Sequence, residues 1–365
     1  MDHWMNWWEY QKLINSGPFM TGTDYRILVR KESIPIVFVP GIMGSRLQRQ
    51  GQPVWDPNST GKMLRLYYNA DPAKREELLN DNNLAVADDT SSDFQSQVKS
   101  ETLGGTMGMY GLSQTSVSDR VEQYKAADQR ANDAVQQGWG TVAWDFYGKI
   151  LQFLASADWS PFTKCFVFPV YAVGYNWVQD NLKSGAYLAS KLTAIKKRET
   201  AKGLICEKLI LVSHSMGGLV TRSCVVLNGG GGDVLGVIHG AQPVLGAPVA
   251  YRRMRAGFEA SWSPLDKISS RVLGPDSATV VPVLGNSVAG LELLPTSLYR
   301  TNGGQTDWLS MTKNGSILHS KPGGDPYASI YENSNDFLRL IYHQEYLDPA
   351  GIVSNSKSLN ARQRE

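Results

Sequence analysis

One stretch, residues 209–220, constrains the fold of this chain more than any other. Its first four residues are apolar and have the length of a short buried strand; a turn of small residues then leads into an apolar helix start. This order is typical of a nucleophile elbow, in which Ser215 stands on a sharp turn with its hydroxyl exposed. Gly217 supplies the small residue needed two positions after the serine, whereas Ser213 replaces the usual glycine two positions before it. We therefore interpret Ser215 as a nucleophile; a serine- and glycine-rich helix cap is the alternative.

A glycine-containing loop follows an earlier apolar strand, residues 34–39. In serine hydrolases a loop in this place donates one backbone amide to the oxyanion of the tetrahedral intermediate, and the residue after the nucleophile donates the other. On that pattern the two donors are the backbone amides of Ile42 and Met216. Residues 40–45 alone also fit an ordinary strand-to-helix turn, so it is their pairing with the elbow that favours an oxyanion hole.

Strand and helix patterns alternate through the second half of the chain. Strands are expected at 166–171, 208–214 and 234–238, and helices at 144–154 and 178–195. This alternation predicts an α/β protein with a mostly parallel sheet and helices on both faces. Together with the elbow, it predicts an α/β-hydrolase fold with a cap or insertion.

The domain organisation follows from changes of composition along the chain. We expect a tryptophan-rich N-terminal segment (1–33), an α/β-hydrolase core (34–350) with a polar insertion at about 46–140 and a lid at about 251–275, and a polar tail (351–365). The N-terminal tryptophans are expected to pack on the domain; a membrane-interface anchor is the alternative. The start of the expected lid mixes arginines with apolar groups, which fits either a helix that meets a phospholipid surface or a plain surface helix.

The composition limits which functions are open to the chain. A formal net charge of +2 gives no electrostatic case for binding nucleic acid. No apolar run reaches the roughly eighteen residues of a membrane-spanning helix, and residues 1–4 lack the features of a secretory signal. The three cysteines, Cys165, Cys206 and Cys224, stand in apolar surroundings and predict buried thiols rather than metal ligands or disulfides.

Several motifs resemble those of a known family. Residues 39–47 (Val-Pro-Gly-Ile-Met-Gly-Ser-Arg-Leu), residues 174–177 (Gly-Tyr-Asn-Trp) and the Ser215 elbow resemble lecithin–cholesterol acyltransferase-like and PGAP1-like lipases. The second motif is usually Tyr-Asp-Trp-Arg in that group, so Asn176 and Val178 depart from it. With the run 240–259, the chain is most similar to bacterial type VI secretion lipase effectors that carry a PGAP1-like hydrolase domain.

This resemblance implies a function, a location and partners. It implies cleavage of acyl esters of membrane phospholipids, so a phospholipid membrane surface is the expected partner. It also implies synthesis in a bacterial cytoplasm without a signal peptide, delivery to the periplasm or envelope of a target cell, and a cognate immunity protein that blocks the toxin. The acyl-enzyme mechanism requires neither a cofactor nor a metal ion.

A serine nucleophile needs a histidine base and an acid that orients it, and in this fold the chain order is serine, acid, histidine. Of the five histidines, His3 comes too early, His214 lies inside the elbow, and His239 leaves no room for an acid before it. His319 and His343 remain as candidate bases.

The acid has no clear candidate. None of the candidate acids between Ser215 and these histidines follows an obvious strand; the candidates include Asp276, Glu292, Asp307 and Asp325. The only apolar candidates for further strands are 278–284 and 316–319, and the first leads into Gly285-Asn286-Ser287. We therefore expect the acid and base on a C-terminal segment or separate chain outside this sequence, with a triad through His319 or His343 as the alternative.

Two other functions stay open at this point. An acyltransferase or an esterase for soluble esters would share the elbow and differ in acceptor and lid. A non-catalytic hydrolase-like scaffold, or an inactive fragment, would fit the missing acid and base but gives no reason to keep the elbow and the oxyanion loop together.

Overall fold

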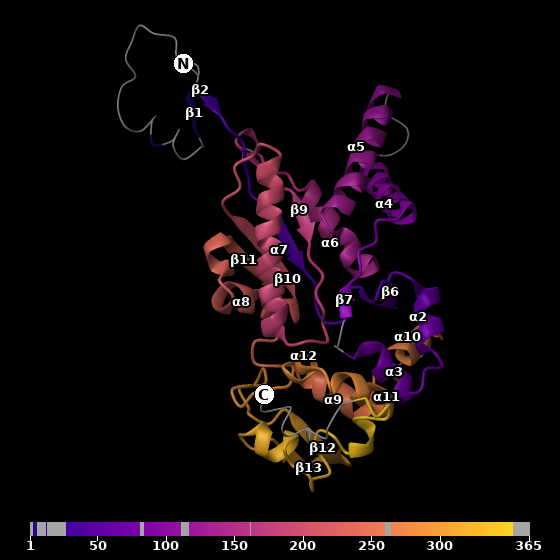
Figure 1. The fold of residues 1–365 in the computed structure, drawn as a ribbon. Coiled ribbons are helices and arrows are strands. Elements are labelled where there is room, and N and C mark those ends of the chain that lie inside the picture. Colours follow the sequence, from indigo (N-terminus) through magenta and orange to yellow (C-terminus); the bar gives the residue numbers. More distant parts are fainter. Residues whose placement is uncertain are drawn as a thin grey trace. The chain divides into compact units, whose positions relative to one another are not determined.

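The computed structural model describes residues 3–5, 12, 27–80, 84–110, 117–160, 162–259 and 264–352 (Figure 1). The chain divides into two compact units. Unit 1 comprises Met1–Gly41, Asp88–Gly174 and Gly185–Gly240, and unit 2 comprises Ile42–Ala87, Tyr175–Ser184 and Ala241–Glu365.

Unit 1 is built on a four-stranded parallel sheet in the order β11-β10-β4-β9. The strands are β4 (Ile36–Val39), β9 (Val170–Ala172), β10 (Leu209–His214) and β11 (Val234–Gly240). The elbow strand β10 pairs with β4 on one side and β11 on the other, so it is internal to the sheet. The strands expected at 34–39, 208–214 and 234–238 are confirmed.

The strand expected at 166–171 is interrupted. Residues 166–167 form β8 (Phe166–Val167), which pairs with β3 (Glu32–Ser33), and only β9 joins the main sheet. Pro169 lies between β8 and β9 and has no backbone N–H to donate to a neighbouring strand, although its carbonyl accepts from Ile36 N. The run is therefore split into two short strands.

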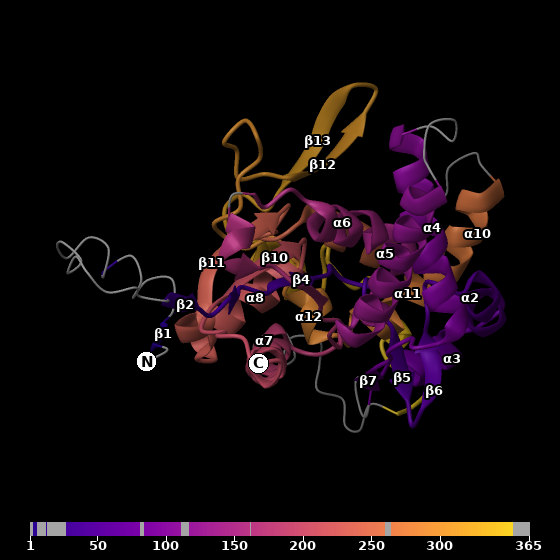
Figure 2. The ribbon, with the colours of Figure 1, turned by 90° about the horizontal axis from the view of Figure 1, so that it is seen from above.

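Helices cover both faces of this sheet (Figure 2). On one face, Ile36 and Phe38 of β4 pack with Trp144 and Leu151 of α6 (Trp144–Ser156). Because side chains alternate along a strand, Val37 points to the opposite face, where α7 (Asn181–Ala201) and α8 (Gly217–Leu227) lie. The α/β-hydrolase fold class expected from the sequence is confirmed.

The expected insertion contributes to both units. Its first part, up to residue 87, belongs to unit 2, and the rest belongs to unit 1. Within unit 1, Phe94 and Val98 of α4 (Ser92–Tyr110) and Ala131 of α5 (Val117–Gln136) join the core beneath α6. These helices therefore complete the hydrophobic core on one face of the sheet.

The remaining elements of unit 1 are short. They are β1 (His3–Met5), β2 (Ile27–Val29), and the single turns η1 (Trp139–Thr141), η2 (Phe162–Lys164) and η3 (Gly230–Asp233). β11 forms one edge of the main sheet, and its Leu235 and Ile238 are 60% and 61% exposed. Apolar side chains on this edge strand are thus left open to solvent.

Unit 2 combines small antiparallel sheets with short helices. Its strands are β5 (Leu47–Arg49), β6 (Gln52–Trp55), β7 (Leu84–Val86), β12 (Leu309–Lys313) and β13 (Ser316–Lys321). Its helices are α2 (Thr60–Tyr67), α3 (Pro72–Leu79), α9 (Pro248–Ala256), α10 (Pro264–Leu273), α11 (Ser277–Leu284) and α12 (Val288–Leu291), with the turns η4 (Tyr327–Tyr331) and η5 (Gln344–Tyr346). None of the described helices combines the length and apolar content that crossing a bilayer requires.

The structure corrects one expectation about the end of the sheet. Residues 278–284, a candidate strand by their valine content, form helix α11 instead. Asp276 caps this helix, and its carboxylate accepts from Thr279 N at 3.0 Å in a reciprocal capping box. The cap and the burial of the valines outweigh the local preference of β-branched residues for strands. Residues 316–319 do lie in a strand, β13, but it pairs antiparallel with β12 in a separate hairpin.

Four of the expected segments fall partly outside the described residues. In the insertion this applies to residues 81–83 and 111–116. In the N-terminal segment this applies to Trp7 and Trp8, in the lid to residues 260–263, and in the polar tail to residues 353–365.

Candidate functional site

Ser215 stands on a strained turn between β10 and α8. Its φ of 51° lies in the left-handed region, which residues other than glycine seldom adopt and which is common at functional sites. Ser215 N donates to Gly240 O at 2.8 Å, and Ser215 O accepts from Gly218 N at 2.9 Å. Backbone contacts to the neighbouring strand and to the helix start therefore hold the serine in the geometry of an elbow.

The small residues around the serine have different reasons to be small. A Cβ atom at Gly217 would lie 2.3 Å from Pro40 O and 2.6 Å from Val39 O, so only glycine fits between α8 and the end of β4. Ser213 is 2% exposed, and its Oγ lies 2.7 Å from His239 Nδ1 on β11. The serine that replaces the usual glycine is tolerated because its hydroxyl has a hydrogen-bond partner on the adjacent strand. This contact also gives His239 a structural role.

The start of the oxyanion loop lies against the elbow. A Cβ atom at Gly41 would be 3.1 Å from both Ser215 Cβ and His214 Nδ1. Gly41 N donates to the hydroxyl of Tyr147 at 3.0 Å, and this hydroxyl lies 3.0 Å from His214 Nδ1. Tyr147 belongs to α6, and sequence reasoning missed it because nothing but its place on a helix of the core marks it.

The two expected oxyanion donors lie in different structural surroundings. Met216 is the N-cap of α8, so its amide stands at the positive end of a helix dipole. Ile42 directly follows Gly41 and is the first residue of unit 2. Within the described part of the chain, neither amide donates to a protein acceptor. Both N–H groups are thus free to bind an oxyanion, and their role as donors stays a prediction.

The two candidate bases lie in unit 2, whereas Ser215 lies in unit 1. His319 is on the exposed strand β13, opposite Met311 of β12. His343 precedes η5; its Nδ1 lies 2.9 Å from Glu345 Oε1, and its side chain is 44% exposed. A histidine next to a carboxylate is the pairing that orients a general base, and sequence reasoning did not consider Glu345.

The four acids considered from the sequence bind backbone or amide groups. Asp276 caps α11, Asp307 accepts from Gly323 N at 2.6 Å, and Asp325 accepts from Tyr327 N at 3.0 Å. Glu292 accepts from the backbone and side-chain amides of Asn181, at 3.1 Å and 2.7 Å. These contacts give each acid a structural role, and none of them involves a histidine.

The motifs that carry the family resemblance make contacts with each other in unit 2. Tyr175 N donates to Ser45 Oγ at 2.9 Å, which joins the second motif to the first. Tyr175 and Trp177 are almost fully buried, with exposed fractions of 1% and 0%. Asn176 and Val178, the two departures from the usual motif, bond to each other: Asn176 Oδ1 accepts from Val178 N at 3.2 Å and so closes a local turn. These motif residues therefore stabilise the fold.

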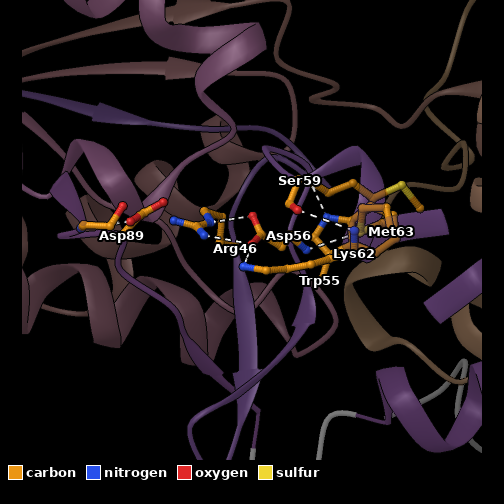
Figure 3. Close-up of polar contacts among 9 residues, drawn as sticks. Arg46, Trp55, Asp56, Ser59, Lys62, Met63 and Asp89 are labelled. Atoms are coloured by element: carbon orange, nitrogen blue, oxygen red, sulfur yellow. Dashed lines mark hydrogen bonds and ion pairs between the residues drawn. The ribbon is translucent and has the colours of Figure 1, made fainter. Parts of the chain in front are cut away.

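Arg46, also in the first motif, belongs to a buried ion-pair cluster (Figure 3). Its guanidinium binds both oxygens of Asp56, at 2.8 Å and 2.9 Å, and Lys62 Nζ lies 3.0 Å from Asp56 Oδ2. Burial favours the neutral carboxyl group, but hydrogen bonds and charges from Arg46 and Lys62 outweigh it and lower the pKa of Asp56. Among the described residues, no group of three or more histidine, cysteine or acidic side chains is arranged to hold a metal ion.

The arginines at the start of the expected lid have partners within unit 2. Arg252 and Arg253 of α9 form ion pairs with Glu259, at 2.8 Å and 3.4 Å. Arg255 lies over the ring of Tyr342 and donates to Phe337 O at 3.0 Å. These contacts reduce the positive charge that α9 offers to an anionic lipid surface.

Comparison with known proteins finds a solved structure with a similar fold. No protein-family model matches the chain, and no match was found among the curated proteins. The chain is similar in structure to a chain of the crystal structure of the Tle4–Tli4 complex, with a TM-score of 0.60 and 24% sequence identity. The match covers 92% of this chain and 70% of the other. A likeness at this identity shows a shared fold.

Proposed function

We propose that this protein is a serine hydrolase that cleaves acyl esters of membrane phospholipids through an acyl-enzyme at Ser215. The observation that carries the proposal is the left-handed backbone of Ser215 between an internal parallel strand and a helix start. A strained backbone of this kind persists only where the surrounding structure holds it in place. In a nucleophile elbow this backbone conformation presents the serine hydroxyl at the carboxyl edge of a parallel sheet.

The chemistry assigned to this site has two steps. Ser215 Oγ bonds to the ester carbonyl carbon while a base takes its proton, and the lipid alcohol leaves with a proton when the tetrahedral intermediate collapses. Water then hydrolyses the acyl-enzyme and releases the fatty acid. The free amides of Ile42 and Met216 are the proposed donors to the oxyanion. His319 and His343 remain the candidate bases within this sequence.

The proposed setting is that of an antibacterial type VI secretion effector. The protein would be made in a bacterial cytoplasm and delivered to the envelope of a target cell, where phospholipid is the substrate surface. A cognate immunity protein is the proposed partner. The sequence resemblance to such effectors supports this setting, and so does the fold shared with a chain of a complex that Tle4 forms with another protein, Tli4.

A non-catalytic scaffold is the second candidate, and it is favoured by the exposure of His319 and the half-exposed side chain of His343. A catalytic histidine is normally held by its surroundings, whereas all of β13 up to residue 320 is exposed. The acyltransferase and soluble-esterase alternatives share the proposed acyl-enzyme and differ only in what accepts the acyl group.

The test compares Ser215 with Ser213, the buried serine two residues before it. Hydrolysis of a short-chain p-nitrophenyl ester is measured for the wild type, Ser215→Ala and Ser213→Ala. We expect Ser215→Ala to lose at least about a thousandfold in kcat, because the covalent step is removed, and Ser213→Ala to stay within about tenfold. Mass mapping after reaction with a fluorophosphonate should place the label on Ser215. A label on another residue, or equal activity of the two variants, would reject the nucleophile assignment.

A further inference from the structure

The hydroxyl of Tyr147 joins the two segments that meet at Ser215. It accepts from Gly41 N at 3.0 Å on the side of the oxyanion loop, and it lies 3.0 Å from His214 Nδ1 on the side of the elbow. Gly41 and His214 are each one residue away from a proposed functional group, since Ile42 follows the first and Ser215 follows the second. One phenol therefore contacts the backbone of the oxyanion loop and a side chain of the elbow.

The direction of the first hydrogen bond follows from its donor. Gly41 N–H can only donate, so the Tyr147 oxygen accepts from it. Burial raises the pKa of Tyr147, although the hydrogen bond from Gly41 opposes the effect, so the phenol keeps its proton at neutral pH. The hydroxyl therefore has both a proton and a second lone pair for His214 Nδ1, and the tautomer of His214 decides which of the two groups donates.

Helix α6, which carries Tyr147, is packed tightly into the core of unit 1. Trp144 and Leu151 of α6 are 2% and 0% exposed. A Cβ atom at Gly148 would lie 2.7 Å from the Trp144 ring, so this ring packs directly on the helix backbone. The Tyr147 ring itself packs on Phe38 of β4, with 5.0 Å between ring centroids. Because α6 and β4 share one core, the phenol is fixed relative to the sheet.

We propose that Tyr147 is a positioning residue of the Ser215 site, whose hydroxyl clamps the oxyanion loop at Gly41 to the elbow at His214. The proposal rests on the proposed function, because a site without chemistry needs no such clamp. Without the hydroxyl, the Gly41 amide loses its acceptor and His214 Nδ1 loses its hydrogen-bond partner. The Gly41 amide would then be free to turn, and it directly precedes the Ile42 amide that is assigned to the oxyanion.

The test removes only the hydroxyl. In Tyr147→Phe the ring still packs on Phe38, and Phe146→Leu is the matched control, because Phe146 is the adjacent residue of α6 and is 78% exposed. We expect Tyr147→Phe to lower kcat by about ten- to a hundredfold with KM changed less than about twofold, as a small misplacement of donors does. Phe146→Leu should keep the wild-type kcat. Thermal unfolding of both variants checks that each is folded at the assay temperature.

A second readout does not depend on catalysis. The ¹⁵N shifts of the His214 ring, assigned by their loss in His214→Gln, report the tautomer of His214, and we expect the tautomer balance to differ between the wild type and Tyr147→Phe. An unchanged kcat in Tyr147→Phe, or a fall in kcat matched by Phe146→Leu, would overturn the positioning role. A His214 spectrum that is the same in both proteins would overturn the clamp. If Ser215→Ala stays active, the proposed function fails, and the His214 spectrum still decides whether the clamp exists.

Discussion

Two regions of the molecule carry candidate catalytic groups, and they are built differently. In the elbow, residues 213–218, the backbone of Ser215 is fixed on two sides and the neighbouring Ser213 is buried with a partner. In the base region, which consists of the β12–β13 hairpin and residues 343–346, His319 is exposed and His343 is half exposed. The nucleophile is thus positioned by contacts within one strand, one turn and one helix, whereas His343 contacts Glu345 and the neighbouring rings of Tyr342 and Tyr346, all within three residues of it.

This difference shows which parts of a catalytic site a local sequence can specify. Strand β10, the turn and α8 follow each other directly in the chain, so their order alone dictates the geometry of Ser215. A base has to reach the serine through tertiary contacts between segments far apart in the sequence, and no local pattern encodes them.

The largest effect is expected at Gly217. In Gly217→Ala the added Cβ would lie 2.3 Å from Pro40 O. Because Pro40 O is a backbone atom, it cannot rotate away as the end of a side chain could. We expect at least about a hundredfold loss of ester hydrolysis, because the elbow must shift to relieve the clash. Overpacking should also destabilise the fold by about 1–3 kcal/mol, measured by urea unfolding.

Gly232→Ala is the control for this change, because a Cβ atom at that position meets nothing within 4 Å. It should keep both activity and stability. If Gly217→Ala were as active as Gly232→Ala, the close approach of α8 to β4 would not matter for the site. The elbow would then no longer differ from the base region in how firmly its catalytic group is positioned.

The elbow was predictable from the sequence, and its surroundings were only partly so. The strand, the turn and the need for a small residue at Gly217 are local features, and the structure has them. The partner of Ser213, His239, depends on the register between β10 and β11, which no single strand reveals. Tyr147 reaches the site from α6, and nothing in its own segment distinguishes it from other residues of that helix.

Beyond the elbow, sequence reasoning was wrong where local preference and tertiary packing disagree. The valines of residues 278–284 favour a strand, yet the capping box at Asp276 and the burial of this segment make it helix α11. The pairing of His343 with Glu345 was missed because the search for an acid was limited to residues between Ser215 and the candidate histidines, and Glu345 follows His343 in the chain.

The buried ion pair in unit 2 should give a smaller effect, on stability. Arg46→Met leaves the Asp56 carboxylate, which is 1% exposed, with Lys62 as its remaining cation. Loss of one partner of a buried pair costs about 3–5 kcal/mol, and we expect the lower end because Lys62 remains. Lys74→Met, in an ion pair whose side chains are about half exposed, should change the free energy of unfolding by less than about 0.5 kcal/mol.

The pH dependence of this stability has a defined sign. The pKa of Asp56 is lower in the folded state, so the stabilisation is present above the unfolded-state pKa of about 3.9 and is lost as the pH falls through the folded-state value. Urea unfolding from pH 7 to pH 3 should therefore show the gap between wild type and Arg46→Met narrowing below about pH 4. A gap that stays constant over this range would mean that the Asp56 pairing is not the source of the stability.

The smallest effects are expected in the base region. In this fold the acid and base follow strands of the parallel sheet. His319 lies instead on an antiparallel hairpin, and His343 follows no strand of that sheet. We therefore expect His319→Ala and His343→Ala each to change kcat for ester hydrolysis by less than about threefold, which would assign the base to another group. A loss in His343→Ala that equals the loss in Ser215→Ala would refute this expectation. Glu345 would then be the orienting acid, because its carboxylate is 2.9 Å from His343 Nδ1, and Glu345→Gln should lower kcat as well.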